Sequence, residues 1–304
     1  MISLPQKAPT MTEEQRVLMT ASCRDCDAIA KVADAGKGVR ESGHMWQIMF
    51  NGLKVRHGAY YGKWMSELIR QLQGHHEPQE ELVFHRVLSR LPPRSRMIEL
   101  GCYWGFYSMW FARDISDARV VLTEPDPRNL DIARQNFRKN NLDDTAIFYR
   151  ACAGFDQQYP LRLESTGDLT PVDGMSVSRL MELQELKYLE LLHMDVQGAE
   201  CDVLESLMEN NLFRKIRFLF VSTHHYQISR DPLVHERCLH AICQMGGHIV
   251  AEHTVDESFS GDGFIVASFS ELDQNFTVPI SRNRASQAFF RPLGYDLAQH
   301  KEKQ

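Results

Sequence analysis

The sequence lacks any long apolar run. A membrane-spanning helix requires about 20 consecutive apolar residues, and no segment comes close to this length. The first residues, MISLPQKAPTMTEEQR, also lack the apolar centre of a secretory signal peptide. We therefore expect a cytoplasmic protein with no membrane partner. The formal net charge of −6 leaves no excess of basic residues, which nucleic-acid binding usually needs, so we expect no nucleic-acid partner.

A disulfide framework is also missing. The seven cysteines are odd in number and scattered, which is typical of reduced thiols. Cys23 and Cys26 form one C-x-x-C pair, but no clear second pair of zinc ligands follows. Cys238, His240 and Cys243 could supply ligands, although their spacing also fits one face of an amphipathic helix. We expect no metal at these groups.

The length of 304 residues, with 43% hydrophobic content, allows one large core plus an accessory segment, or two modest domains. The breaker Leu91-Pro92-Pro93 marks the expected domain entry. We predict an N-terminal α+β accessory region over residues 1–92, a main domain over 93–280 and a tail over 281–304. Within the accessory region, residues 12–35 have helical character, an Asn51-Gly52 pair predicts a β-hairpin, and helices are expected over 63–73 and from Pro78.

Strands and helices alternate through the main domain. Strands are expected at 96–100, 119–124, 145–150, 188–194 and 216–222, helices at 108–113, 129–140, 201–210 and 232–244, and a terminal hairpin at 248–253 and 263–269. This alternation predicts the α/β class, with a parallel sheet covered by helices on both faces.

A glycine loop follows the first expected strand of the main domain. Gly101 and Gly105 allow a sharp turn and a close approach to a ligand. The loop lacks the second glycine of the dinucleotide pattern G-x-G-x-x-G, and the carboxylate of Glu99 would repel a pyrophosphate. A cofactor that carries an ammonium and a sulfonium, such as S-adenosyl-L-methionine, fits this loop better.

Acidic residues lie at the carboxyl ends of the neighbouring strands, where open α/β sheets bind their ligands. Glu124 ends the second strand, 23 residues after Gly101, and can accept both hydroxyls of a ribose. Asp195 ends the fourth strand, with Gly198 in the following turn and Glu200 at the start of a helix.

These three motifs resemble the FkbM-like family of S-adenosylmethionine-dependent methyltransferases. The matching stretches are 99–105, 124–127 with Asn136 on the next helix, and 195–200, within a region of about 95–270. The resemblance implies a Rossmann-like seven-stranded methyltransferase sheet with its last strand antiparallel. It also implies methylation of a hydroxyl on a sugar or natural product. Two positions depart from the family pattern. Gln197 stands where the family commonly has glutamate. The fifth strand ends in residues 222–226, Ser-Thr-His-His-Tyr, where many family members have an acidic residue.

Candidate site residues follow from these motifs. A base with a pKa near neutral would relieve the acceptor of its proton. His224 and His225 end the fifth strand, where at most one can face the ligand; His224 is slightly favoured, and Asp195 is the second candidate. The cofactor candidates are Glu99, Gly101, Tyr103, Gly105, Ser108, Glu124, Pro125, Cys152 and Asp195, and the acceptor candidates are Tyr60, Tyr61, Trp64, Gln197 and Tyr226.

Several features stay open at this point. A polar cluster could ligate a metal, hold the methionine end of the cofactor or start a helix; it comprises His75, His76, Glu77, Glu80 and Glu81. His193 is expected to be buried, and Arg282 and Arg284 suit either an anionic substrate group or a solvated tail. The edge of the N-terminal hairpin makes a homo-oligomer possible.

Two other functions compete with methyl transfer. A nicotinamide-dependent oxidoreductase would share the expected sheet, but the missing glycine and Glu99 disfavour it. A methyltransferase-like protein that binds without turnover is the third possibility, because the end of the fifth strand is altered.

Overall fold

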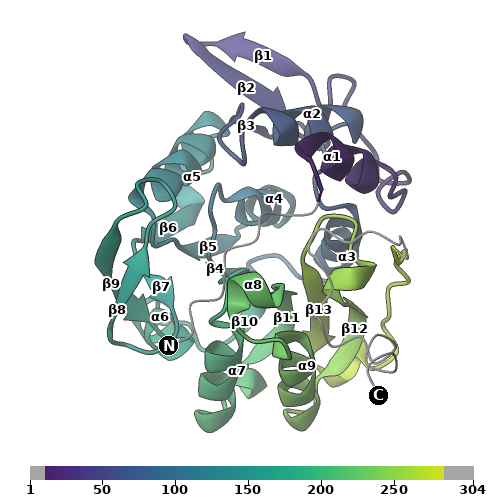
Figure 1. Cartoon of the computed structure of the whole chain (residues 1–304). Helices are drawn as coiled ribbons and strands as arrows, with labels where there is room; N and C mark the ends of the chain where they lie inside the picture. Colours follow the sequence, from purple (N-terminus) through teal and green to yellow (C-terminus); the bar gives the residue numbers. More distant parts are fainter. Residues whose placement is uncertain (1–10, 284–304) are drawn as a thin grey trace, which may run out of the picture.

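A seven-stranded sheet forms the centre of the protein in the computed structural model, which describes residues 11–283 (Figure 1). Its strands are β4 (Arg96–Leu100), β5 (Arg119–Thr123), β6 (Ala146–Tyr149), β10 (Leu189–Met194), β11 (Ile216–Thr223), β12 (His248–His253) and β13 (Gly263–Ser268). The strand order is β12-β13-β11-β10-β4-β5-β6, and β13 runs in the opposite direction to the other six strands of this sheet. The predicted methyltransferase-type sheet is confirmed.

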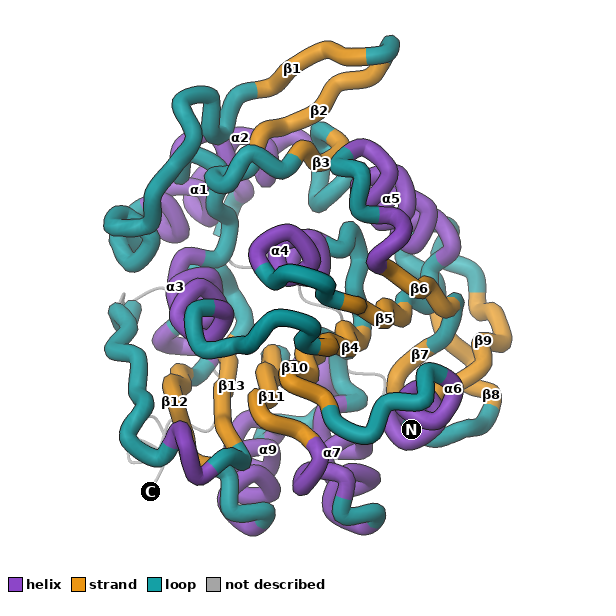
Figure 2. Tube along the Cα trace, turned by 180° about the vertical axis from the view of Figure 1, so that it is seen from behind, coloured by secondary structure: helices purple, strands orange, loops and turns teal. Residues whose placement is uncertain are grey.

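Helices cover both faces of this sheet (Figures 1 and 2). One face carries α3 (Pro78–Leu88), α4 (Phe106–Asp114) and α5 (Pro127–Lys139), and the other carries α6 (Val177–Leu183), α7 (Glu200–Glu209) and α9 (Val234–Gln244). Successive side chains of β11 alternate between the two cores: Phe218 and Phe220 enter one, while Leu219 and Val221 enter the other. Burial on both sides explains why these strands are mostly apolar.

The accessory region contains a second, three-stranded antiparallel sheet beside two helices. It consists of α1 (Glu13–Ala21), β1 (Gly38–Glu41), β2 (His44–Ile48), β3 (Lys54–Arg56) and α2 (Lys63–Gln71). The hairpin expected at Asn51-Gly52 joins β2 to β3. A second hairpin, which the sequence analysis missed, turns at Ser42-Gly43 and adds β1. The helical character expected over 12–35 was too long, because the chain leaves the helix after Ala21 and forms turns there.

A third small sheet was also missed. It is formed by β7 (Cys152–Ala153), β8 (Gln158–Arg162) and β9 (Leu169–Met175). Pro160 and Pro171 lie opposite each other in the β8–β9 pair. Proline within a run argues against a strand, so this edge hairpin carries a misleading local signal. The remaining short helical turns are α8 (Tyr226–Ser229), η1 (Asp143–Thr145), η2 (Leu212–Lys215), η3 (Val255–Glu257) and η4 (Glu271–Asp273).

The accessory region shares a core with the main sheet. Met49, Phe50 and Leu68 belong to the same buried cluster as Trp110 and Phe220. The rings of Phe50 and Trp110 meet edge to face, with centroids 4.7 Å apart. Residues 11–92 therefore pack directly on the sheet domain. Most of the predicted tail, including Arg284, lies outside the described residues.

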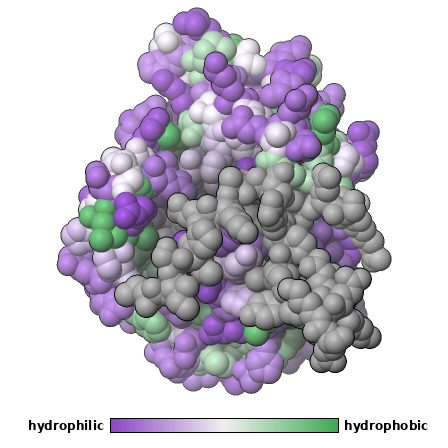
Figure 3. Space-filling view, in the orientation of Figure 1, coloured by the Kyte–Doolittle hydropathy of each residue, from purple (hydrophilic) through white to green (hydrophobic). Residues whose placement is uncertain are grey.

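The surface of the described part is mostly hydrophilic on the face seen in Figure 3, with apolar residues in separate spots. None of the helices within residues 11–283 combines the length and apolar character needed to cross a bilayer.

Asn136 on α5 joins the accessory region to the glycine loop. Its Oδ1 accepts a hydrogen bond from the Arg56 backbone N at 2.8 Å, and its Nδ2 donates to the Trp104 carbonyl at 2.9 Å. Asn140, one turn later, binds both backbone groups of Lys54 at 2.8 Å. Two asparagine side chains of α5 thus form hydrogen bonds with the backbone of β3.

Replacing Asn136 with alanine should lower the free energy of unfolding by about 2–4 kcal/mol, because it leaves the Arg56 N–H and the Trp104 carbonyl without partners. Equilibrium denaturation in urea measures this loss. Gln135→Ala is the matched control: its exposed amide binds only Asp131 on the same helix, so the change should stay within about 0.5 kcal/mol. Equal losses in the two variants would contradict the bridging role of Asn136.

Candidate active site

A pocket of about 410 Å³ lies at the carboxyl ends of β4, β5 and β10, where open α/β sheets bind their ligands. The loops after these three strands form its floor. The β8 strand and the residues after it form one wall, and residues from the start of α3 and the loop before α2 form another. The pocket thus draws on the main sheet, the small third sheet and the accessory region.

Two of the strand-end loops touch at Gly101. Its φ is +75°, and a Cβ there would lie 1.9 Å from the Asp195 carbonyl oxygen. The Asp195 backbone N also donates to the Leu100 carbonyl at 3.0 Å. Only glycine permits both the backbone conformation and this approach. Gly105 has a similar φ of +74° and begins α4, but it faces the ring of Phe137 and not the pocket.

Glu99 presents an unpartnered oxygen at the pocket floor. The side chain is buried, and its Oε2 has no hydrogen-bond partner. Burial raises the pKa of Glu99 to about 7, although the charge of nearby His193 opposes the shift. Because buried polar atoms are normally satisfied, an ammonium group would fit this position.

Glu124 is held rigidly at the end of β5. Its Oε2 accepts from the Tyr103 backbone N at 3.0 Å, and its Oε1 accepts from the Asp126 backbone N at 2.9 Å. Burial raises the pKa of Glu124 to about 7, and the two backbone hydrogen bonds favour the ionised form. The geometry is that of a fixed carboxylate, able to bind two neighbouring hydroxyls.

His224 lies between carboxylates behind the pocket. Its Nδ1 is 2.6 Å from Glu200 Oε1, and its Nε2 is 3.0 Å from Asp195 Oδ1 and 4.0 Å from Asp262 Oδ1. Burial alone would lower the pKa of His224, but the three carboxylates raise it well above its usual value. The surrounding carboxylates therefore favour the imidazolium form of His224. Burial opposes ionisation of Asp195, yet the ion pair with His224 lowers the pKa of that carboxyl.

The wall from the accessory region is acidic and aromatic. Glu77 accepts from the Tyr107 hydroxyl at 2.9 Å and from the Tyr60 hydroxyl at 3.4 Å. Burial raises the pKa of Glu77 to about 7. Tyr60 stacks on Trp104 with centroids 4.5 Å apart. Glu77 thus faces the pocket as well as starting α3.

Glu80 and His193 form a second polar pair at the pocket. The two side chains are 2.8 Å apart, and His193 is buried, as expected from the sequence. Burial alone would lower the pKa of His193, but Glu80 raises it.

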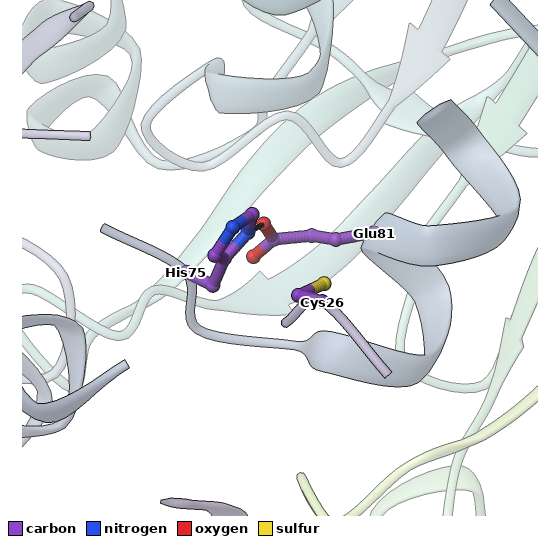
Figure 4. A group of neighbouring side chains, drawn as sticks. All are labelled: Cys26, His75 and Glu81. Atoms are coloured by element: carbon purple, nitrogen blue, oxygen red, sulfur yellow. Dashed lines mark hydrogen bonds and ion pairs between the residues drawn. The ribbon is translucent and has the colours of Figure 1, made fainter. Parts of the chain in front are cut away.

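Glu81 points away from the pocket into a buried cluster with Cys26 and His75 (Figure 4). The ligand atoms of these three residues lie within 4.8 Å of one another, the one such group in the described part of the chain that could hold a metal. Glu81 binds His75 Nδ1 and accepts from the His76 backbone N at 2.7 Å, while the Cys26 thiol donates to the Pro78 carbonyl at 3.1 Å. These bonds dock the turns after α1 onto the start of α3.

Most of the sequence-predicted residues meet in the pocket. The lining includes Tyr60, Tyr61, Glu99, Gly101, Tyr103, Glu124, Pro125, Cys152, Asp195 and Gln197. The other predicted residues lie outside the lining: Trp64, Gly105, Ser108, His224, His225 and Tyr226. Ser108 is fully buried in α4, and His224 reaches the pocket through Asp195. Trp64 packs on Tyr61, with ring centroids 6.1 Å apart.

Several lining residues escaped the sequence analysis, namely Asn129, Tyr159, Arg162, Glu164 and Asp202. Glu164 and Gln197 both line the pocket, and Gln197 lowers the pKa of the Glu164 carboxyl, which burial raises; a glutamate at position 197 would instead add a like charge to this pocket. Local sequence carries no signal for this arrangement. Arg282 is paired with Glu252 at 2.8 Å and with Glu257, so its charge serves an ion-pair network.

Comparison with known proteins identifies the family. The family model described as the methyltransferase FkbM domain matches residues 97–249, half of the chain. None of the curated proteins matches the chain significantly. Among solved structures, an O-methyltransferase from Bacillus cereus in complex with SAH is 20% identical, with a TM-score of 0.42, and the match covers 63% of this chain and 80% of that chain.

Precorrin-6y C5,15-methyltransferase from Geobacter metallireducens is 12% identical, with a TM-score of 0.40 and coverage of 62% of this chain and 88% of that chain. TrmK from M. capricolum, in complex with S-adenosyl-homocysteine, is 13% identical, with a TM-score of 0.38 and coverage of 64% and 74%. Since the family model covers half of the sequence, the chain belongs to the FkbM methyltransferase family, whose cofactor is S-adenosyl-L-methionine.

Proposed function

We propose that this methyltransferase acts on oxygen, and that its acceptor is a hydroxyl of a sugar or natural-product small molecule. The observation that carries the proposal is Asp195, an ionised carboxylate at the pocket floor whose partner His224 lies behind it. A hydroxyl needs such a group, because it must lose its proton as the oxygen gains a methyl group.

The pocket residues fit S-adenosyl-L-methionine. This cofactor supplies an electrophilic methyl group on a sulfonium. We assign Glu124 to the ribose hydroxyls and the unpartnered oxygen of Glu99 to the ammonium group. Gly101 lets the backbone approach the cofactor, and Cys152 lies on the adenine side of the pocket.

Asp195 is the proton acceptor in this proposal, and His224 is a positioning residue. As the hydroxyl oxygen gains a methyl group it becomes positively charged, and its O–H proton becomes strongly acidic. A carboxylate is therefore a sufficient base. The sequence slightly favours His224 for this role, but an imidazolium with a raised pKa has no free lone pair at neutral pH. Its charge instead keeps Asp195 ionised and holds it in place.

The lining favours an uncharged, hydroxyl-rich acceptor. Glu77, Glu80 and Glu164 can accept hydrogen bonds from hydroxyls, and Arg162 is the one arginine or lysine among the described lining residues. An anionic acceptor would meet an excess of negative charge. The rings of Tyr60 and Tyr61 offer flat apolar surfaces for a sugar or a planar natural product.

The family match gives no support to a nicotinamide-dependent oxidoreductase. Binding without turnover is the competing function, and assaying methyl transfer alongside cofactor binding distinguishes it. The cytoplasmic location and the homo-oligomer stay predictions.

Glu124→Gln should weaken the binding of S-adenosyl-L-methionine by about 10- to 100-fold, because the amide accepts the ribose hydroxyls without the charge. Isothermal titration calorimetry measures the affinity. Wild-type affinity should also fall below pH 7, because protonation of Glu124 removes the same charge.

Asp202→Asn, which neutralises an exposed carboxylate of the same pocket, is the control and should bind within about twofold of wild type. Undiminished binding by Glu124→Gln would refute the ribose assignment. Tight cofactor binding with no S-adenosylhomocysteine formed in the presence of hydroxylated acceptors would indicate binding without turnover.

Glu200→Gln should lower the pKa of His224, because it removes one of the carboxylates that stabilise the imidazolium. Since the folded-state pKa is raised, the ion pairs stabilise the protein at low and neutral pH, and this contribution is lost as the pH rises through that pKa. NMR titration of the His224 ring measures the shift. Glu205→Gln, on the exposed side of α7, should leave the titration unchanged; a wild-type midpoint near 6.5 would contradict the assigned charge.

A further inference from the structure

Two cysteines that the proposed reaction does not use lie in contact on the sheet face that carries α6, α7 and α9. Cys201 is in the first turn of α7, Cys238 is in α9, and their sulfur atoms are 3.8 Å apart. Both are free thiols. A disulfide requires a separation of about 2.05 Å, so small side-chain movements on two packed helices would close the bond.

The two thiols differ in a way that suits stepwise oxidation. Cys201 is partly exposed, whereas Cys238 is fully buried. The hydrogen bond from Cys238 lowers the pKa of Cys201, and the charge of Arg237 acts in the same direction. Because the thiolate is the reactive form, Cys201 is the accessible nucleophile and Cys238 is a protected thiol directly beside it.

We propose that Cys201 is an oxidation site and that Cys238 resolves it to a reversible disulfide when the protein meets hydrogen peroxide. The Cys201 thiolate attacks one peroxide oxygen and forms a sulfenic acid, and hydroxide leaves. The sulfur of Cys238 then attacks the sulfenic sulfur, the S–S bond forms, and water leaves with the Cys238 proton. Two thiols are oxidised by two electrons, and one peroxide is reduced.

The bond would link the two helices that hold the end of β11. Glu200, the residue before Cys201, is hydrogen-bonded to His224 at 2.6 Å. His235 of α9 is hydrogen-bonded to the Thr223 hydroxyl at 2.9 Å. Oxidation would therefore join α7 and α9 covalently next to the hydrogen-bonded group of Glu200, His224 and Asp195.

The full-length protein, reduced and then treated with hydrogen peroxide, tests the proposal. Intact mass should fall by two hydrogens and return with dithiothreitol, and peptide mapping should find the Cys201–Cys238 link. The oxidised form should melt several degrees higher, and hydrogen exchange in the first turn of α7 should slow. Cys152→Ser and Cys243→Ser are the controls and should keep the link, because neither cysteine contributes to it.

Cys201→Ser should lose the mass change. Cys238→Ala should instead trap the sulfenic acid, which dimedone labels on Cys201. Sulfinic or sulfonic acid on Cys201 of the wild-type protein without a link, a link between other cysteines, or thiols that stay reduced would each overturn the proposal. The wild-type peptide map decides the matter even where a variant fails to fold.

Discussion

The close contact between the backbone of Gly101 and the carbonyl of Asp195 is the constraint on which the site depends. A Cβ at position 101 would lie 1.9 Å from that oxygen, so the contact exists only with glycine. It brings the loops that follow the neighbouring strands β4 and β10 into contact, beside the pocket that Glu99 and Asp195 line. The side chains with chemistry are therefore positioned by main-chain packing.

The second theme is how the protein manages buried negative charge. Burial raises the pKa of several pocket carboxyls, namely Glu77, Glu99 and Glu124, and others are paired with a histidine. Asp195 is of the second kind, because buried His224 carries a positive charge beside it. A cationic cofactor would neutralise part of the remaining charge, since opposite charges favour the ionised form of each carboxyl.

The accessory region completes the pocket and does not stand apart from the sheet. Its core is continuous with that of α4, and Asn136 connects its strand β3 to the glycine loop. Its hydrogen-bonded cluster of Cys26, His75 and Glu81 lies behind the wall that presents Glu77 and Glu80. The buried hydrogen bonds of this cluster thus hold in place the pocket wall that would face the acceptor.

By itself, the sequence determined the alternation of strands and helices, the glycine loop, and Glu124 and Asp195 at strand ends, because each depends on short-range pattern or on the rule that parallel strands end at one edge. Only the tertiary structure decided which side chains meet there. Glu164 joins Gln197 in the pocket lining from a hairpin that its prolines concealed, and His224 lies behind Asp195 because Glu200 of α7 binds its other nitrogen. Such contacts, and the charge states that follow from burial, join residues far apart in the chain, so no local pattern encodes them.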